Sequence, residues 1–312
     1  MGRLTDRKII LIIRLTRLDE LVSRFNTLAQ AKFYVEHLGA DFSDYQQEDQ
    51  TYKSAIRQTE AHLGELGRVQ VLQRSFLPNF VFGKDDMVVV LGQDGLVANT
   101  LKYLDGRPVV AVNPDPARYD GVLLPFNVTD LPKVIHEVFR GKRAFKEITM
   151  AKTHLNDGQT LLAVNDFFIG VKSHTSARYL LTVGTKTEQQ SSSGIIISTG
   201  LGSTGWLKSI LAGATGIAGY ITDKYSRKVS QPRISWDSDF LYFTVREPFP
   251  SKVSSAKLVF GKITKKEPMT IVSQTPENGV VFSDGIEADY LNFNSGTTAL
   301  ISVHDKKGLL VI

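Results

Sequence analysis

Residues 87–104, MVVVLGQDGLVANTLKYL, decide the fold of this 312-residue chain. The apolar run Met87–Leu91 is typical of a β-strand buried on both faces, and helical spacing of apolar residues predicts a helix over Leu96–Leu104. The turn Gly92-Gln93-Asp94-Gly95 joins the two elements. A buried strand followed directly by a helix is the unit from which parallel sheets with helices on both faces are built.

The same alternation of strands and helices extends over the first half of the chain. We expect an α/β N-terminal domain with a parallel Rossmann-like sheet. The segment 40–60, which contains the acidic and glutamine-rich FSDYQQEDQ, is expected to hold an exposed loop between helices. The remaining strands are predicted at Lys8–Ile13, Val69–Leu72 and Val109–Val112, and the helices at Asp19–Leu38, Tyr52–Leu66 and Leu131–Phe139.

The pattern changes near Gly141. Short strand-like runs then recur with turn signals between them and few helices, which predicts an all-β antiparallel C-terminal domain. The predicted domains are therefore residues 1–141 and 142–312. The predicted strands of the second are Thr160–Asn165, Phe167–Val171, Tyr179–Gly184, Gly194–Ser198, Asp239–Val245, Ala256–Phe260, Thr270–Ser273, Val280–Phe282, Thr297–His304 and Leu309–Ile312.

The composition excludes several classes of protein. The chain has no cysteine, which excludes disulfides and thiolate metal sites and fits a reducing cytoplasm. Its six histidines are scattered, so no metal site made by the protein alone is expected. The apolar run from Ile9 to Ile13 is too short for a membrane span and lacks a signal-peptide cleavage site. With 37 basic and 32 acidic residues, the chain is predicted to be cytoplasmic, without membrane or nucleic-acid partners.

The turn Gly92-Gln93-Asp94-Gly95 is the first candidate site. In an open α/β sheet, ligands bind just beyond the carboxyl ends of the strands. The glycines allow backbone N–H groups to approach phosphate oxygens, and the start of the following helix favours an anion. Asp94 would place a carboxylate in the same space. The alternative is an ordinary Asp-Gly turn.

The second candidate site is the stretch STGLGSTGW, residues 198–206. Its glycines and hydroxyl side chains suit a loop that wraps a polyphosphate, and the alternative is a flexible linker. A linker would not normally lie between the apolar runs GIII and WLKSIL, so we favour a binding loop.

The same stretch contains G-x-G-x-x-G from Gly200 to Gly205, with Asp223 at the distance of a ribose-binding acid. A dinucleotide-binding dehydrogenase is a further alternative on this ground. It is disfavoured because the neighbouring strands look antiparallel and because Gly213, Gly216 and Gly219 are expected to interrupt the following helix.

Two shorter motifs complete the set of candidates. Asn165-Asp166 follows the run TLLAV and could hydrogen-bond a ribose or a base, and Ser283-Asp284-Gly285 lies near the end of the chain. Taken alone, each is more often a turn between two strands.

The four motifs in this order resemble those of the NAD kinase family, whose fingerprints are G-G-D-G, N-E, S-T-P-T-G-S-T-A-Y and D-G. The resemblance implies a Rossmann-like domain followed by a β domain. It also implies phosphoryl transfer from ATP to a ribose hydroxyl of NAD, Mg²⁺ on the donor phosphates and a homo-oligomer. By resemblance, Asp94 is the general base and Asn165, Asp166 and Asp284 bind the acceptor. The implied phosphate-binding residues are Gly92, Gln93, Gly95, Ser198, Thr199, Gly200, Gly202, Ser203 and Thr204.

The chain departs from the family pattern at four places. Gln93 replaces a glycine, Asp166 is one methylene shorter than the family's glutamate, and Asn113-Pro114-Asp115-Pro116 stands where N-T-G is usual. Ser191–Gly194 stands where the family commonly has an aspartate before a glycine. Two alternatives therefore stay open: a kinase of the same fold that acts on another hydroxyl acceptor, such as a lipid or a sugar, and a catalytically weak nucleotide-binding regulator.

Overall fold

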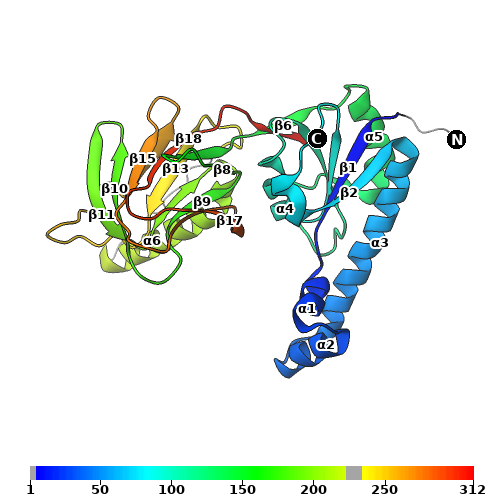
Figure 1. Ribbon diagram of the computed structural model, residues 1–312, viewed down its shortest axis with the longest axis horizontal. Helices are drawn as coiled ribbons and strands as arrows, with labels where there is room; N and C mark the ends of the chain where they lie inside the picture. Colours follow the sequence, from blue (N-terminus) through cyan, green and yellow to red (C-terminus); the bar gives the residue numbers. More distant parts are fainter. Residues whose placement is uncertain (1–4, 223–233) are drawn as a thin grey trace. The chain divides into compact units, whose positions relative to one another are not determined.

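The computed structural model describes residues 5–222 and 234–312. The chain divides into two units, the first comprising the residues up to Lys146 together with Leu309–Ile312, and the second Glu147–Gly308 (Figure 1). The last strand thus belongs to the first unit, whereas the sequence predicts it in the β domain. The reason lies in its run of apolar residues, GLLV, which suits a strand covered on both faces better than an alternating strand of a β domain.

The first unit is built on a sheet with strand order β2-β1-β3-β4-β19-β6, and β5 also pairs with β4. The pairs β1–β2, β1–β3, β3–β4, β4–β5 and β4–β19 are all parallel, which confirms the predicted sheet. The strands are β1 (Lys8–Ile13), β2 (Arg68–Gln73), β3 (Met87–Leu91), β4 (Pro108–Asn113), β5 (Phe126–Asn127), β6 (Phe145–Ile148) and β19 (Gly308–Val311).

The helices of this unit cover the sheet with apolar faces. Tyr52, Leu63 and Ile135 are buried in one core with the strand residues Leu11, Val89 and Val110. The helices are α1 (Arg17–Phe25), α2 (Leu28–His37), α3 (Phe42–Leu66), α4 (Asp94–Leu101) and α5 (Leu131–Phe139), with the 3₁₀ turns η1 (Arg74–Asn79) and η2 (Val128–Asp130).

The single helix predicted over Asp19–Leu38 is wrong, because the structure has two helices there. Asn26 ends α1 in the left-handed region, with φ of +66°, which asparagine tolerates better than most residues. Thr27 then caps α2, since its side chain accepts a hydrogen bond from the N–H of Gln30 at 3.2 Å. The apolar spacing runs through this break, so periodicity alone did not reveal it.

The loop expected within residues 40–60 is also wrong, since helix α3 occupies the segment from Phe42 onward. The acidic residues of this segment lie against basic residues that follow β1. The buried carboxylate of Glu48 accepts hydrogen bonds from Arg14 at 2.7 Å and Arg17 at 2.5 Å. The polar composition of residues 40–60 therefore reflects a buried ion-pair network rather than a solvated loop.

We predict that Glu48→Gln lowers the free energy of unfolding by about 3 kcal/mol, because Arg14 is left buried without its counter-charge. Urea denaturation followed by circular dichroism measures this change. The matched control is Glu36→Gln, since Glu36 forms an exposed pair with Lys32 at 3.7 Å and its loss should cost less than about 0.5 kcal/mol. Equal effects of the two substitutions would contradict the assignment of Glu48.

The second unit is formed by two six-stranded sheets whose inner faces share one apolar core, which confirms the predicted antiparallel β domain (Figure 1). One sheet has the order β11-β10-β15-β18-β7-β8 and the other β14-β13-β12-β9-β16-β17. Their strands are β7 (Ala151–Leu155), β8 (Thr160–Ala163), β9 (Asp166–Val171), β10 (Ala177–Val183), β11 (Lys186–Ser192), β12 (Ile195–Ser198), β13 (Phe240–Val245), β14 (Phe260–Thr264), β15 (Met269–Ser273), β16 (Gly279–Ser283), β17 (Ile286–Asn292) and β18 (Thr298–Val303). The turn η3 (Gly202–Thr204) and helix α6 (Trp206–Thr222) follow β12.

The predicted strand Ala256–Phe260 is wrong, because β14 begins only at Phe260. Polar strands such as β11, KTEQQSS, escaped prediction because hydrogen bonds to β10 form them and little apolar surface marks them. In the described part of the chain, no helix is both long and apolar enough to cross a membrane.

Candidate functional site

Three of the four predicted motifs meet at one end of the sheet that contains β9. Strand β9 lies between β12 and β16 and pairs antiparallel with both, so its first residues lie beside the last residues of its neighbours. Asp166 is paired with Ser198, and Phe167 with Ser283. The antiparallel register therefore brings together Asn165-Asp166, the start of the hydroxyl-rich loop and Asp284.

Asp284 holds the turn that precedes β9. Its Oδ1 accepts hydrogen bonds from the backbone N–H groups of Asn165 at 2.6 Å, Val164 at 3.1 Å and Asp166 at 3.2 Å. Asp284 itself has φ of +54°, a left-handed conformation that aspartate adopts more readily than most residues. The structure thus gives this residue a structural task, namely fixing the backbone that presents Asn165 and Asp166.

We predict that Asp284→Ala destabilises the fold by about 2–4 kcal/mol, because backbone N–H groups lose their acceptor and alanine is strained at positive φ. Asp284→Asn keeps one acceptor oxygen and should cost clearly less. Thermal melts of both variants, beside Asp305→Ala at an exposed ion pair, measure the effect. A melting temperature of Asp284→Ala equal to that of Asp305→Ala would contradict this role.

Asp166 is the most perturbed acid of this cluster. Its Oδ1 is inaccessible to solvent and has no hydrogen-bond partner among the described residues. Burial raises the pKa of Asp166 to about 7, the charge of Asp284 adds to this shift, and the hydroxyl of Ser198 opposes it. Near neutral pH, Asp166 can therefore both donate and accept a hydrogen bond, which suits a ligand hydroxyl.

We predict that Asp166→Asn stabilises the protein at pH 8 by roughly 1–3 kcal/mol. The folded protein retains a proton at Asp166 that the unfolded chain loses above the ordinary pKa of 3.8, so stability falls as pH rises from about 4 to about 7. The substitution removes this dependence, and the two proteins should be equally stable below pH 4. Denaturation at both pH values measures this, and a variant no more stable than the parent at pH 8 would contradict it.

The hydroxyl-rich loop is packed against the same turn. The Thr199 hydroxyl donates to the carbonyl of Val164 at 2.6 Å, and its N–H donates to the carbonyl of Asn165 at 2.9 Å. A Cβ atom at Gly202 would lie 2.2 Å from the Asn165 carbonyl oxygen, so only glycine fits this approach. The alternative of a flexible linker is therefore excluded for this stretch.

The other hydroxyls of the loop bond to the loop itself. Ser203 donates to the carbonyl of Gly200 at 2.7 Å, Thr204 to that of Leu201 at 3.3 Å, and Ser198 to that of Thr199 at 3.3 Å. These bonds hold the loop in a compact turn ahead of α6. Binding a phosphate through these side chains would require them to exchange partners.

The surroundings of the G-x-G-x-x-G sequence are not those of a dinucleotide-binding fold, because β12 pairs antiparallel with both neighbours. The expected interruption of the following helix is wrong, however. Helix α6 continues through Gly213, Gly216 and Gly219 to Thr222. Asp223, the acid that the dehydrogenase alternative requires, lies outside the described residues.

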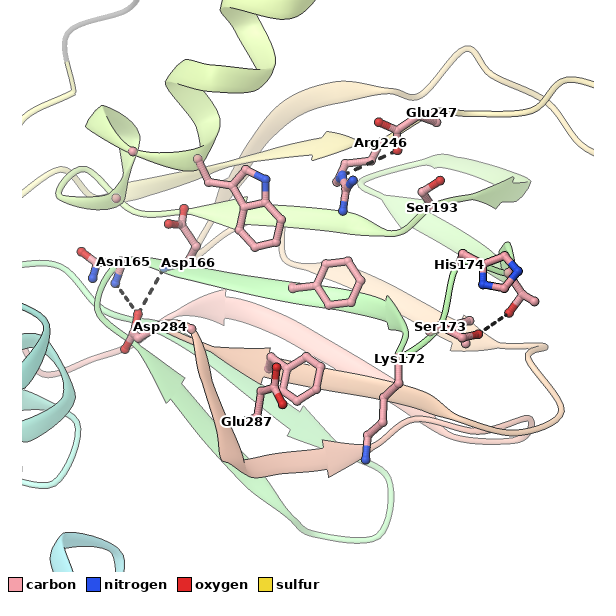
Figure 2. A pocket seen from close by; sticks show the side chains of 18 of the residues that line it. Asn165, Asp166, Lys172, Ser173, His174, Ser193, Arg246, Glu247, Asp284 and Glu287 are labelled. Atoms are coloured by element: carbon pink, nitrogen blue, oxygen red, sulfur yellow. Dashed lines mark hydrogen bonds and ion pairs between the residues drawn. The ribbon is translucent and has the colours of Figure 1, made fainter. Parts of the chain in front are cut away.

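A cavity of about 900 Å³ begins at Asn165 and Asp166 and runs along the outer face of the sheet, beside the start of α6 (Figure 2). Aromatic rings line its middle. Trp206 stacks on Phe168 with ring centroids 5.9 Å apart and planes inclined by 12°, and Phe168 lies 6.2 Å from Phe282. This size and this mixture of flat apolar surface with a few polar groups are typical of small-molecule sites.

Sequence reasoning missed several residues of this cavity, among them Phe168, Arg246 and Phe282, whereas Trp206 ends the predicted stretch 198–206. The signal for Phe168 was present, because side chains alternate along a strand and Asp166 and Phe168 must share one face of β9. Arg246 carried no sequence signal, because it belongs to none of the four motifs. Only the position of β13 in the sheet brings it to the cavity.

The turn Gly92-Gln93-Asp94-Gly95 lies in the first unit, at the carboxyl end of β3. Strands β1 and β3 are neighbours in a sheet of order β2-β1-β3-β4, so the chain leaves them in opposite directions, and ligands of open α/β sheets bind at such a switch point. Asp94 is the first residue of α4, and its Oδ1 accepts a hydrogen bond from the N–H of Leu123 at 2.7 Å. Its carboxylate is therefore held in place by the backbone.

Neither a family model nor a curated protein sequence matches the chain. Solved structures do. Yeast NADH kinase complexed with NADH is similar over 98% of this chain and 84% of that chain, with 14% identity and a TM-score of 0.58. The chain has the NAD kinase fold. An NAD kinase from Archaeoglobus fulgidus in complex with ATP is similar over 98% of this chain and 93% of that chain, with 13% identity and a TM-score of 0.57. The resemblance inferred from the motifs is thereby confirmed at the level of the fold.

Proposed function

We propose that the chain is a phosphotransferase of the NAD kinase type, which moves the γ-phosphoryl group of ATP to a ribose hydroxyl of NAD or a related nucleotide. The observation that carries the proposal is the convergence of Asn165-Asp166 and the 198–204 loop on one cavity of the NAD kinase fold. The similar yeast and Archaeoglobus proteins were solved with NADH and ATP, which supports nucleotides as ligands.

The acceptor is proposed to bind in the cavity of the second unit. Asn165 and Asp166 supply an amide and a carboxyl group for ribose hydroxyls, and Asp284 keeps both in place through the backbone. The rings of Phe168, Trp206 and Phe282 provide apolar surface for a base.

The donor is proposed to be ATP as its magnesium complex, in which the metal offsets the charge of the phosphates. The glycine-rich turns, Gly92–Gly95 in the first unit and residues 198–204 in the second, are each proposed as phosphate-binding segments, because small residues allow the backbone to approach closely. The N–H groups of Gly92, Thr199, Gly202 and Ser203 already donate within the protein, so the proposed contacts involve other N–H groups of these turns. Gln93 is the one residue of the first turn that adds a bulky side chain there.

Asp94 is proposed to accept the proton of the attacking hydroxyl. The transition state of phosphoryl transfer is loose, so catalysis depends mostly on positioning, and a weakly basic carboxylate is sufficient. The Leu123 N–H binds Oδ1 of Asp94, so Oδ2 is the oxygen that we propose meets the hydroxyl.

We predict that purified protein converts NAD to NADP with MgATP and that Asp94→Asn lowers kcat at least about 100-fold, as expected for loss of a general base. The asparagine can still accept the Leu123 hydrogen bond, so the ATP dissociation constant should change less than about threefold. A coupled NADP assay and calorimetry measure the two quantities. The control is Asp85→Asn, at an exposed position before β3, which should leave kcat unchanged.

Two results would contradict the proposal. Tight ATP binding without transfer to any nucleotide would favour a regulator, and transfer only to a lipid or sugar hydroxyl would favour the other kinase alternative. We further propose a homo-oligomer, as the resemblance implies, and a cytoplasmic location, as the composition indicates. Sedimentation velocity tests the first and fractionation of the source cells the second.

A further inference from the structure

The end of the cavity remote from Asp166 is marked by Arg246. Its N–H donates to the carbonyl of Gly194 at 2.8 Å, and the registers of β13, β12 and β9 place it level with Gly170. Gly170 lies four residues along β9 from Asp166, which corresponds to roughly 13 Å between the backbones. Arg246 and Asp166 therefore mark different subsites of one cavity (Figure 2).

The guanidinium group of Arg246 contacts an aromatic ring and forms a long ion pair. It lies 5.6 Å from the centre of the Trp206 ring, so the arginine side chain reaches back toward the middle of the cavity. Its ion pair within the described residues is with Glu247, with Nε 3.6 Å from the carboxylate and the two side chains 31% and 64% exposed. A long, exposed pair of this kind is weak, and a phosphate that meets the guanidinium with two parallel hydrogen bonds can displace it.

The neighbours of Arg246 suit an anion as well. Ser193 and the ring of His174 lie at the same end of the cavity, and Lys172 lies at its edge (Figure 2). The hydroxyl-bearing Thr175 lines the cavity as well. Four acids also line the cavity, namely Glu247 and Glu287 in addition to Asp166 and Asp284. The acids outnumber Lys172 and Arg246, so selectivity for an anion depends on the geometry of Arg246 rather than on net charge.

We propose that Arg246 binds a phosphate group of the acceptor, so that this site selects nucleotides over uncharged nucleosides. The inference rests on the proposed function in one respect, namely that the acceptor occupies this cavity. The acceptor then places a hydroxyl at Asp166, its apolar surface on the rings of Phe168 and Trp206, and an anionic group at Arg246. Arginine suits this task because its planar fork matches the oxygens of a phosphate.

The test compares AMP with adenosine, two probes that differ only in the phosphate. Calorimetry should show that the parent protein binds AMP at least about 10-fold more tightly than adenosine. In Arg246→Gln the preference should fall below about twofold while the affinity for adenosine stays unchanged. Arg246→Lys should give an intermediate preference, because lysine keeps the charge and loses the fork.

Two further variants sharpen the test. Glu247→Gln removes the competing carboxylate and should raise the preference for AMP. Arg178→Gln is the matched control, since Arg178 is an exposed arginine of the same unit outside the cavity, and it should leave the preference unchanged. Melting curves of all variants show whether they are folded.

Several outcomes would overturn the inference. These are an equal affinity of the parent for AMP and adenosine, no binding of either probe, a preference that survives in Arg246→Gln, and an equal loss of both affinities in that variant.

The transfer assay separates this inference from the proposed function. NADP formation with an unchanged phosphate preference in Arg246→Gln would reject the role of Arg246 alone. Loss of the preference in that variant, without NADP formation by the parent, would reject the kinase alone.

Discussion

The site of the second unit depends on one carboxylate. Asp284 comes directly after β16, yet its oxygens hold the N–H groups of Val164, Asn165 and Asp166, which precede and begin β9. The hydroxyl-rich loop in turn bonds to the carbonyls of Val164 and Asn165. Segments more than a hundred residues apart are thereby fixed to one short turn. The Asp284 carboxylate thus fixes the backbone from which the amide of Asn165 and the carboxyl of Asp166 project.

This arrangement also explains the unusual state of Asp166. The turn places its carboxyl group beside a second acid and away from solvent, and burial favours the protonated form. The fold maintains this unfavourable environment because β9, β12 and β16 are tied by regular antiparallel pairing on both sides. Such a perturbed group in a cavity is a frequent feature of functional sites.

Much of the fold could be predicted from the sequence, because it follows from local patterns. The buried strand Met87–Leu91, the turn after it and helix α4 are neighbours in the chain, and their hydrophobic pattern specifies them. Features that depend on distant partners could not be predicted. The acidic segment of α3 is helical because Glu48 pairs with Arg14 and Arg17, and the final strand joins β4, which lies about 200 residues earlier in the sequence.

In the site, too, local patterns could be predicted and contacts between distant segments could not. Its four motifs were visible as residue types in a given order, but only the register of the strands shows that three of them share one end of a sheet. Arg246 and Phe168 carry no motif, and their positions follow from the pairing of β13, β12 and β9. The order of motifs thus predicts the fold better than it predicts the residues that line the cavity.

We propose that this chain transfers a phosphoryl group from ATP to a nucleotide hydroxyl. The most direct measurement follows the phosphorus atom: the protein is incubated with Mg²⁺, NAD and ATP labelled at the γ-position, and the products are separated. We expect label in NADP, in a phosphate ester that forms only when NAD is present. Label recovered solely as ATP or as free phosphate would contradict it.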